Sequence, residues 1–174
     1  MDFSKFKVHD WLMVGGGAAM LILGMALDWS SFGGVSGDGP FDYFFTGGIA
    51  WILVVAVGVL ALLRAGGKLP ETQPWALIFL AATGLAAILM ILRILLGGRD
   101  VGGGFEVDRG TGMYAAVVWT GIALAGAVMN FTASGGNFND LKDMDKLKGS
   151  FGGSKSNNDL PPPPPPTPPT TPGV

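Results

Sequence analysis

The run PWALIFLAATGLAAILMILRILL spans residues 74–96 and contains a single charged side chain, Arg93. An α-helix rises about 1.5 Å per residue, so about 20 apolar residues are enough to cross the ~30 Å hydrocarbon core of a bilayer. A helix in the core of a water-soluble domain does not need so long an apolar run. The run therefore predicts a transmembrane helix, and lipid is the solvent in which the rest of the chain is interpreted.

Three further apolar runs follow the same logic, at about 11–29, 46–64 and 113–131. We predict an all-α membrane protein, a four-helix transmembrane bundle made of two helical hairpins. Only 14% of the 174 residues are charged, against about 25% in an ordinary soluble domain. The predicted organisation is a cytoplasmic leader over 1–10, a four-span domain over 11–131, a polar juxtamembrane segment over 132–152 and a disordered Pro-rich tail over 153–174.

The residue types present exclude several kinds of site. The chain has no cysteine and one histidine, His9, so a disulfide, a catalytic thiol and a multi-histidine metal site are all excluded. His9 and Asp10 are adjacent, but adjacency along the chain does not make a catalytic pair. We predict no catalytic, cofactor-binding or metal-binding residues and a protein that is not an enzyme. The net charge of −2 and the dispersed basic residues argue against nucleic-acid binding.

The distribution of basic residues predicts the orientation. In a four-span chain the N-terminus, the middle turn and the C-terminal segment share one side, which carries eight Lys and Arg residues. The two opposite loops carry Arg99 and Arg109, with Arg93 at the margin. By the positive-inside rule, both termini are predicted to be cytoplasmic in a multi-pass plasma-membrane protein. The eight basic residues are Lys5, Lys7, Arg64, Lys68, Lys142, Lys146, Lys148 and Lys155.

Small residues four positions apart recur in three of the four runs. In lipid such pairs let neighbouring helix backbones approach closely, so that packing drives association. We expect them to pack the helices of one chain together, and an interface between copies of the chain is the alternative. The candidate helix-packing residues are Gly15, Ala19, Ala82, Ala86, Ala116, Thr120, Gly121 and Ala125.

Arg93 is the one charged residue that lies inside a predicted span and not at its boundary, and such residues often mark function. It lies three residues from the end of the apolar run at Leu96, where a long side chain can extend to the headgroups. We expect this extension. The alternative pairs Arg93 with an acidic residue on the same side, which would tie the two outer loops together. The candidate partners are Asp28, Asp42, Glu106 and Asp108.

The predicted outer loops are rich in glycine. The first, residues 28–47, carries three aspartates and several aromatic residues that suit the membrane interface, and we expect a small, partly ordered cap. A cation site at Asp28, Asp38 and Asp42 is the alternative, although their spacing matches no calcium loop. The second loop, residues 97–112, is not read as a nucleotide-binding loop, because no strand is predicted before it and it has no GKS or GKT ending. Thr111 is expected to be the N-cap of the last span.

The C-terminal segment is polar and then proline-rich. Phe138, Leu141, Met144 and Leu147 recur every third residue, which fits a short surface helix or a solvated linker equally well. The tail favours polyproline II, an extended spacer and a ready ligand for aromatic-lined grooves. We therefore consider a cytosolic polyproline-binding protein as a partner. The candidate partner-binding residues are Pro161, Pro162, Pro163, Pro164, Pro165 and Pro166.

Three stretches carry a resemblance: LGMALDWSSFGG at the exit from the first span, GTGMYAAVVWTGIALAGAV at the fourth, and KDMDKLKGSFGG with the proline tail. In these the chain resembles small bacterial, particularly actinobacterial, four-span membrane proteins of uncharacterised function with a proline-rich cytoplasmic tail. The resemblance is architectural. It implies a bacterial plasma-membrane location and supplies no catalytic residues.

These features favour a structural or scaffolding membrane protein, either an accessory subunit of a membrane complex or a recruiter of a cytosolic partner through its tail. The alternative is a small homo-oligomeric transporter or channel. Proteins of that class normally carry polar groups at the bilayer midplane and broken helices. Here only Gly15–Gly17, Arg93 and the mid-span hydroxyls of Thr83 and Thr120 point that way.

Overall fold

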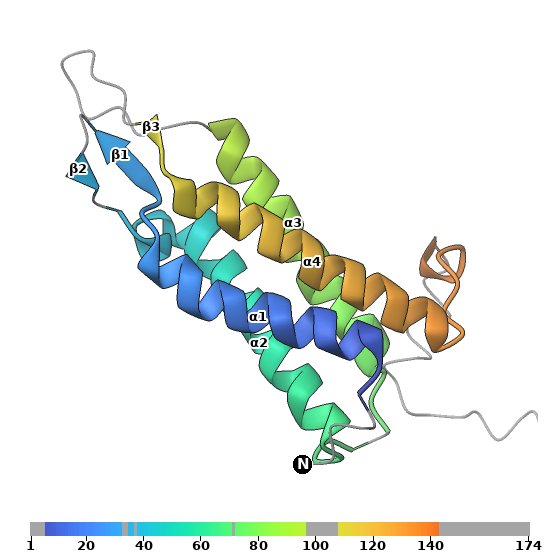
Figure 1. Cartoon of the computed structure of the whole chain (residues 1–174). Helices are drawn as coiled ribbons and strands as arrows, with labels where there is room; N and C mark the ends of the chain where they lie inside the picture. Colours follow the sequence, from blue (N-terminus) through green and yellow to red (C-terminus); the bar gives the residue numbers. More distant parts are fainter. Residues whose placement is uncertain (1–5, 33–34, 37, 71, 97–107, 143–174) are drawn as a thin grey trace, which may run out of the picture.

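The computed structural model describes residues 6–32, 35–36, 38–70, 72–96 and 108–142 (Figure 1). Short 3-10 and π turns, η2 Pro40–Tyr43 and η3 Phe44–Gly48, lead directly into the second of its long helices. Counted with these turns, four segments are long and apolar enough to cross a membrane. The predicted all-α bundle of four membrane-length helices is therefore confirmed. The helices are α1 Val8–Ala26, α2 Ile49–Ala65, α3 Trp75–Leu96 and α4 Thr111–Ala133.

Helix α1 begins at Val8, three residues before the apolar run that starts at Trp11. The Asp10 side chain accounts for this early start, because its Oδ2 accepts the Lys7 backbone N–H at 3.1 Å. A carboxylate in the first turn that reaches back to the N-cap amide is half of a capping box and favours helix initiation. The cap fixes Lys7, His9 and Asp10 at one end of the bundle.

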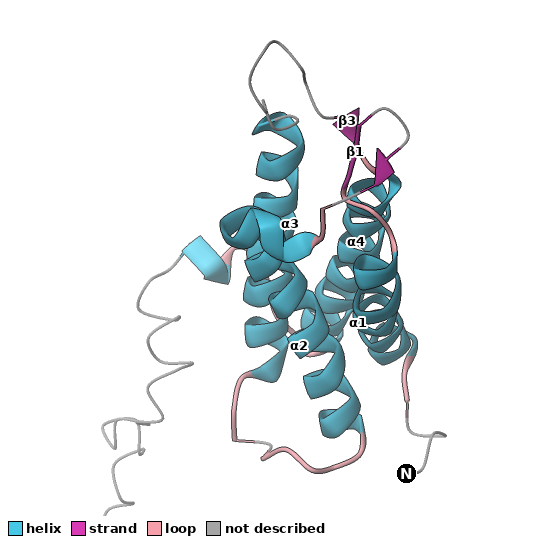
Figure 2. Cartoon of the chain, turned by 90° about the vertical axis from the view of Figure 1, so that its left-hand side faces the viewer, coloured by secondary structure: helices cyan, strands magenta, loops and turns pink. Residues whose placement is uncertain are grey.

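The four helices form a ring. Helix α1 packs against α2 and α4, and α3 packs against the same two helices. The contact between α1 and α4 is the most extensive, although these are the first and last helices. Figures 1 and 2 show that the start of α1, the α2–α3 turn and the end of α4 share one end of the bundle, which we call the turn end. The opposite end carries three short strands and is called the sheet end.

Glycines bring α1 close to both of its neighbours. Gly17 lies against Gly58 of α2, and a Cβ at position 17 would be 2.7 Å from the Gly58 Cα. Gly16 faces α4, where a Cβ would be 3.0 Å from the Trp119 carbonyl oxygen. Gly126 of α4 lies equally close to α1. Close backbone contact of this kind supplies the packing that holds helices together in lipid.

The predicted helix-packing residues divide between the interior and the surface. Five are buried or half-buried, namely Ala19, Ala82, Ala86, Ala116 and Thr120. Three are exposed on the surface of the single chain, namely Gly15, Gly121 and Ala125. Space around Gly15 and Gly121 is open to 4 Å. Gly15 is left out of the contacts within the chain because α1 turns Gly16 and Gly17 toward α4 and α2. Gly121 and Ala125 lie on the exposed face of α4.

The interior of the bundle is filled by apolar side chains. One cluster, including Met20, Val54 and Met90, lies toward the sheet end, and a second, around Met13 and Phe79, lies toward the turn end. The two mid-span hydroxyls also lie in this interior. Thr83 and Thr120 each donate to a carbonyl of their own helix at 2.7 Å, so both are satisfied locally.

A small antiparallel sheet joins the two loops of the sheet end, where we expected a small, partly ordered cap in the first loop. The central strand β1 Ser30–Phe32 pairs with β2 Val35–Ser36 and with β3 Asp108–Arg109. The loop after α1 is thereby tied to the loop before α4 by backbone pairing. Strands of two or three residues are too short to show the alternation of polar and apolar residues that predicts strands.

The start of α4 differs from the expected Thr111 cap. The N-cap is Gly110, with no side-chain cap bond. The chain after α1 satisfies the first amides instead, because Gly110 N–H donates to the Trp29 carbonyl at 2.9 Å and Gly112 N–H donates to the Asp28 carbonyl at 2.8 Å. The Thr111 prediction is wrong because the cap is a tertiary contact between distant segments.

Candidate functional site

Arg93 is buried near the sheet end of α3. The residue is 6% exposed, and its guanidinium carbon lies 3.5 Å from the centroid of the Tyr43 ring. The expectation that Arg93 extends along lipid to the headgroups is therefore wrong. The physical reason is that η2 brings an aromatic face to the cation, and the electrostatic attraction between them is strongest where water is excluded.

Tyr43 links this cation to a carboxylate. The Tyr43 hydroxyl donates to Asp38 Oδ2 at 2.8 Å, and the Ser30 hydroxyl donates to the same oxygen at 2.7 Å. These contacts run from α3 through η2 to β1, and we call Arg93, Tyr43, Asp38 and Ser30 the Arg93 cluster. The carboxylate in it, Asp38, was not among the acidic partners that the sequence suggested.

The acidic residues predicted to pair with Arg93 either have other contacts, are exposed, or lie outside the described residues. Asp42 Oδ2 accepts the Gly39 backbone N–H at 2.7 Å and so caps η2. Asp28 and Asp108 have exposed side chains, and Glu106 lies outside the described residues. Within the described part of the chain, no three His, Asp or Glu side chains gather closely enough to hold a metal ion.

Trp29 joins three segments beside this cluster. Its side chain is fully buried, and its indole N–H donates to the Gly24 carbonyl at 2.8 Å. Its backbone N–H donates to the Asp38 carbonyl at 2.9 Å, and its carbonyl accepts from Gly110. Trp29 was predicted only as an interfacial aromatic, whereas it holds the end of α1, the first loop and the start of α4 together.

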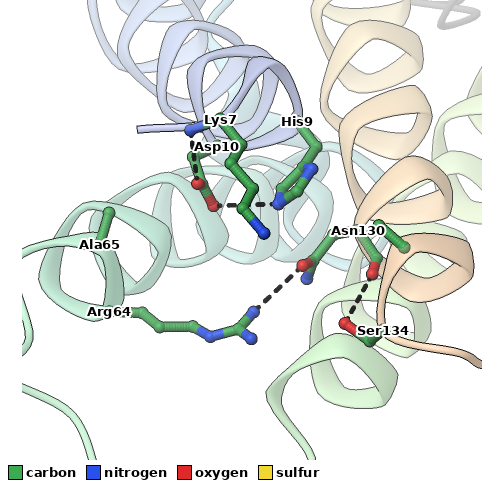
Figure 3. A pocket seen from close by; sticks show the side chains of 8 residues that line it. Lys7, His9, Asp10, Arg64, Ala65, Asn130 and Ser134 are labelled. Carbon is green, nitrogen blue, oxygen red and sulfur yellow. Dashed lines mark hydrogen bonds and ion pairs between the residues drawn. The ribbon is translucent and has the colours of Figure 1, made fainter. Parts of the chain in front are cut away.

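A polar pocket of about 160 Å³ lies at the turn end, among the ends of α1, α2 and α4 (Figure 3). Its position follows from the helix bounds, since α1 begins at Val8 and α2 and α4 end at Ala65 and Ala133. The pocket combines three basic side chains with one carboxylate, one amide and one hydroxyl. These polar residues are Lys7, Arg64, His9, Asp10, Asn130 and Ser134.

Arg64 and Asn130 form the centre of the turn-end pocket. Arg64 Nη1 donates to Asn130 Oδ1 at 3.2 Å and thereby connects α2 to α4. Asn130 is 2% exposed, and its Nδ2 has no hydrogen-bond partner among the described residues. The guanidinium carbon of Arg64 also lies 5.9 Å from the centroid of the Phe79 ring. A buried amide donor is therefore held beside a positioned cation.

His9 and Asp10 lie on the α1 side of the same pocket. His9 Nε2 is 3.7 Å from Asp10 Oδ1, which is a charge contact when the imidazole is protonated and is too long for a hydrogen bond. Asp10 Oδ2 already accepts the Lys7 amide. Asp10 thus caps the start of α1, and its neighbour His9 lies beside it in the pocket wall.

The sequence alone did not single out Asn130, the residue in the pocket whose buried amide N–H groups lack an acceptor among the described residues. It lies in the run MNF at the end of the fourth apolar stretch, where a lone amide looks like the boundary of a span. Only the crossing of α2 and α4 reveals its pairing with Arg64. The predicted tail site, Pro161 to Pro166, lies outside the described residues.

Comparison with protein-family models gives no match, and the searches of curated proteins and of solved structures give none either.

Proposed function

We propose that this chain is a small structural membrane protein that holds a cytosolic partner at the bilayer through its Pro-rich tail, as a recruiter or as an accessory subunit of a larger complex. One observation carries the proposal: the polar groups buried in the bundle core and at its sheet end are bonded inside the protein, some between structural elements and some within a single helix. Trp29 and the Arg93 cluster join loops to helices, and the hydroxyls of Thr83 and Thr120 bond within their own helices. A fixed bundle of this kind is what an anchor requires.

The exterior of the bundle suits lipid. Large apolar side chains such as Ile22, Phe45, Ile88 and Leu95 are each more than 60% exposed. Exposed apolar surface on this scale marks a membrane or protein contact in a chain with four membrane-length helices. Lipid is therefore the proposed solvent for these side chains, with other subunits or a second copy of the chain covering part of them.

The proposed orientation places the turn end in the cytoplasm of a bacterial plasma membrane. Among the described residues, Lys7 at the start of α1, Arg64 in the last turn of α2 and Lys68 in the α2–α3 turn belong to this end. Arg109 in β3 and the buried Arg93 belong to the sheet end. Basic residues are retained on the cytoplasmic side during membrane insertion. The Pro-rich tail follows α4 at the turn end and would then face the cytosol.

A tail substitution tests recruitment. The full chain and a variant with residues 161–166 replaced by a Gly-Ser spacer of equal length would each be purified from native membranes and their co-purifying proteins identified. We expect a cytosolic protein with an aromatic-lined groove to be lost from the variant, because Gly-Ser chains lack polyproline II structure. Membrane-embedded partners retained by both forms are the internal control. Identical sets of proteins from the two forms would contradict tail-mediated recruitment.

The buried Arg93 favours one second candidate, a small homo-oligomeric transporter or channel, because an ionisable residue within a span often serves solute movement. Reconstituted vesicles would report solute flux for the unmodified chain, for Arg93→Ala and for Lys68→Gln, whose exposed side chain lies in the α2–α3 turn. Flux abolished by Arg93→Ala and retained by Lys68→Gln would support this candidate. Absence of flux from the unmodified chain would leave the structural role preferred.

A further inference from the structure

We propose that the turn-end pocket binds the oxygens of a phosphate group, carried either by a lipid headgroup or by free inorganic phosphate. The proposal rests on Lys7, Arg64 and Asn130, which three different helix ends bring to one pocket. Figure 3 shows the Lys7 ammonium, the Arg64 guanidinium and the Asn130 amide directed toward a common space. The proposal that this pocket binds phosphate does not depend on recruitment of a partner by the Pro-rich tail.

The buried amide of Asn130 supplies the first argument. Its Oδ1 accepts from Arg64 Nη1, which fixes which way the amide is turned. Nδ2 therefore carries two N–H donors in a residue that is 2% exposed, and no described residue accepts from it. Buried donors in folded proteins are nearly always paired, and leaving one unpaired is costly. The pocket thus calls for an acceptor.

The surrounding charges indicate that this acceptor is an anion. Lys7 and Arg64 are both cations, whereas Asp10 is the one carboxylate on the pocket wall. Asp10 is occupied at the start of α1, where Oδ2 accepts the Lys7 amide and Oδ1 faces His9 Nε2 at 3.7 Å. The Ser134 hydroxyl is also occupied, since it donates to the Asn130 carbonyl at 2.8 Å. A net positive charge therefore accompanies the unmet donor.

Arg64 is held ready for such a ligand. Its hydrogen bond to Asn130 and its position 5.9 Å from the centroid of the buried Phe79 ring restrict the guanidinium before any ligand arrives. Guanidinium groups bind phosphate oxygens through several N–H groups in a fixed fork, and prior restriction lowers the entropy lost on binding. Lys7, whose side chain is exposed, can close over the ligand from α1.

Size and position favour phosphate over a single water, which is the rival occupant. A cavity that holds one water needs about 10–15 Å³ in this measure, whereas the pocket measures about 160 Å³ and is large enough for a tetrahedral oxyanion. The pocket also lies at the ends of membrane-length helices, the depth at which a bilayer presents its headgroups. Basic pockets between transmembrane helices are known binding sites for lipid headgroups.

Asn130→Asp is the sharpest test. An aspartate keeps the oxygen that accepts from Arg64 and replaces the amide N–H groups by an oxygen that repels an oxyanion. The full chain would be purified in an alkyl maltoside, which contains no phosphate, and binding would be measured by thermal shift and equilibrium dialysis. The probes are inorganic phosphate, short-chain phosphatidylglycerol and short-chain diacylglycerol. An unchanged cooperative unfolding transition without ligand shows that the variant is folded.

We expect phosphatidylglycerol, inorganic phosphate or both to bind the unmodified chain. Asn130→Asp should weaken this binding by about tenfold or more, because charge-assisted hydrogen bonds are lost and a repulsive charge is gained. Lys7→Gln should weaken it severalfold. The matched control is Lys68→Gln, an exposed lysine of the same end that does not line this pocket. Its affinity should match that of the unmodified chain.

The three probes distinguish a lipid headgroup from free phosphate as the ligand. Binding of inorganic phosphate alone assigns the site to a free anion, binding of phosphatidylglycerol alone assigns it to a lipid, and binding of both assigns it to the shared group. Binding that is equal for diacylglycerol and phosphatidylglycerol would overturn the proposal. So would binding that survives Asn130→Asp, binding that Lys68→Gln reduces as much as Lys7→Gln, or no binding of either phosphate probe.

Discussion

Arg93 illustrates how a single cation is kept inside an apolar bundle. Its charge is placed over the Tyr43 ring, whose hydroxyl is bonded in turn to the Asp38 carboxylate. A buried charge is tolerated when it is paired and costs several kcal/mol when a partner is removed. The Arg93 cluster is therefore expected to behave as a unit, in which each member depends on the others.

Substitutions in the Arg93 cluster should reveal this dependence. Arg93→Met should lower the free energy of unfolding by about 2 kcal/mol, the value of a desolvated cation–π contact. Tyr43→Phe keeps the aromatic face and should cost only about 1 kcal/mol, for the lost hydrogen bond to Asp38. Tyr43→Leu removes both contacts and should cost more. The measurement is thermal unfolding in detergent micelles.

A double-mutant cycle of Arg93→Met with Tyr43→Leu separates their coupling from the separate effects of each substitution. Lys68→Gln, an exposed cation in the α2–α3 turn, is the control and should leave unfolding unchanged. If Arg93→Met unfolds at the same temperature as the unmodified chain, the stacking contact contributes no stability and the account of this cluster fails.

Single residues also mark the limit of prediction from sequence. The run around Arg93 identified an intramembrane charge, but the ring that covers it comes from η2, about 50 residues earlier in the chain. Asn130 and Trp29 were missed as organising residues for the same reason, since their partners belong to distant segments. Hydrophobic runs are local signals, whereas the pairing of buried polar groups is decided only when the helices meet.

At the scale of elements, α1 is distinguished by consecutive glycines that serve different neighbours. Gly16 faces α4 and Gly17 faces α2, because successive residues of a helix point about 100° apart. Gly15 points away from both and is exposed. Three adjacent residues of one type thus have three different environments.

Alanine substitutions in α1 test this assignment directly. Gly17→Ala places a methyl group where the Gly58 Cα stands 2.7 Å away, and backbone cannot move aside cheaply. We expect a loss of about 1–3 kcal/mol in the free energy of unfolding, the usual cost of overpacking. Gly15→Ala, two positions away on the same helix, is the matched control and should be neutral or slightly stabilising, because the space there is open.

Equal effects of the two alanine substitutions on detergent unfolding would show that the α1–α2 contact is not held by backbone proximity. A change of oligomeric state in Gly15→Ala, seen by light scattering, would instead assign the exposed glycine to an interface between copies of the chain. The sequence indicated that small residues pack these helices, but the rotation of each helix could not be read from the spacing alone.

For the whole molecule, the four-helix architecture was the most predictable property, because long apolar runs in a chain with little charge have few other solutions. The ring order of the helices and the sheet were not predictable. They depend on loops of mostly polar and glycine residues that carry no hydrophobic periodicity. Backbone pairing between Ser30 and Arg109 is an example, since nothing in either local sequence marks it.

Orientation can be measured cleanly because the chain contains no cysteine. Single-cysteine variants at two exposed positions, Lys68→Cys in the α2–α3 turn and Asp108→Cys in β3, would be treated in intact cells with a membrane-impermeant maleimide. The excess of basic residues at the turn end predicts labelling at position 108 and protection at position 68 until the cells are opened. The reverse pattern would contradict the proposed cytoplasmic turn end, and labelling of both would indicate dual topology.

The contact between α1 and α4 has a consequence for biogenesis. Helix α1 leaves the ribosome before α4 and finds its most extensive partner only after α4 has entered the bilayer. Until then, the carbonyls of Asp28 and Trp29 lack the amides of Gly112 and Gly110 that later bond to them. A nascent chain stalled before residue 110 therefore lacks the α1–α4 contact and leaves that face of α1 uncovered. Such a chain is the kind of intermediate that insertion chaperones bind and membrane proteases degrade.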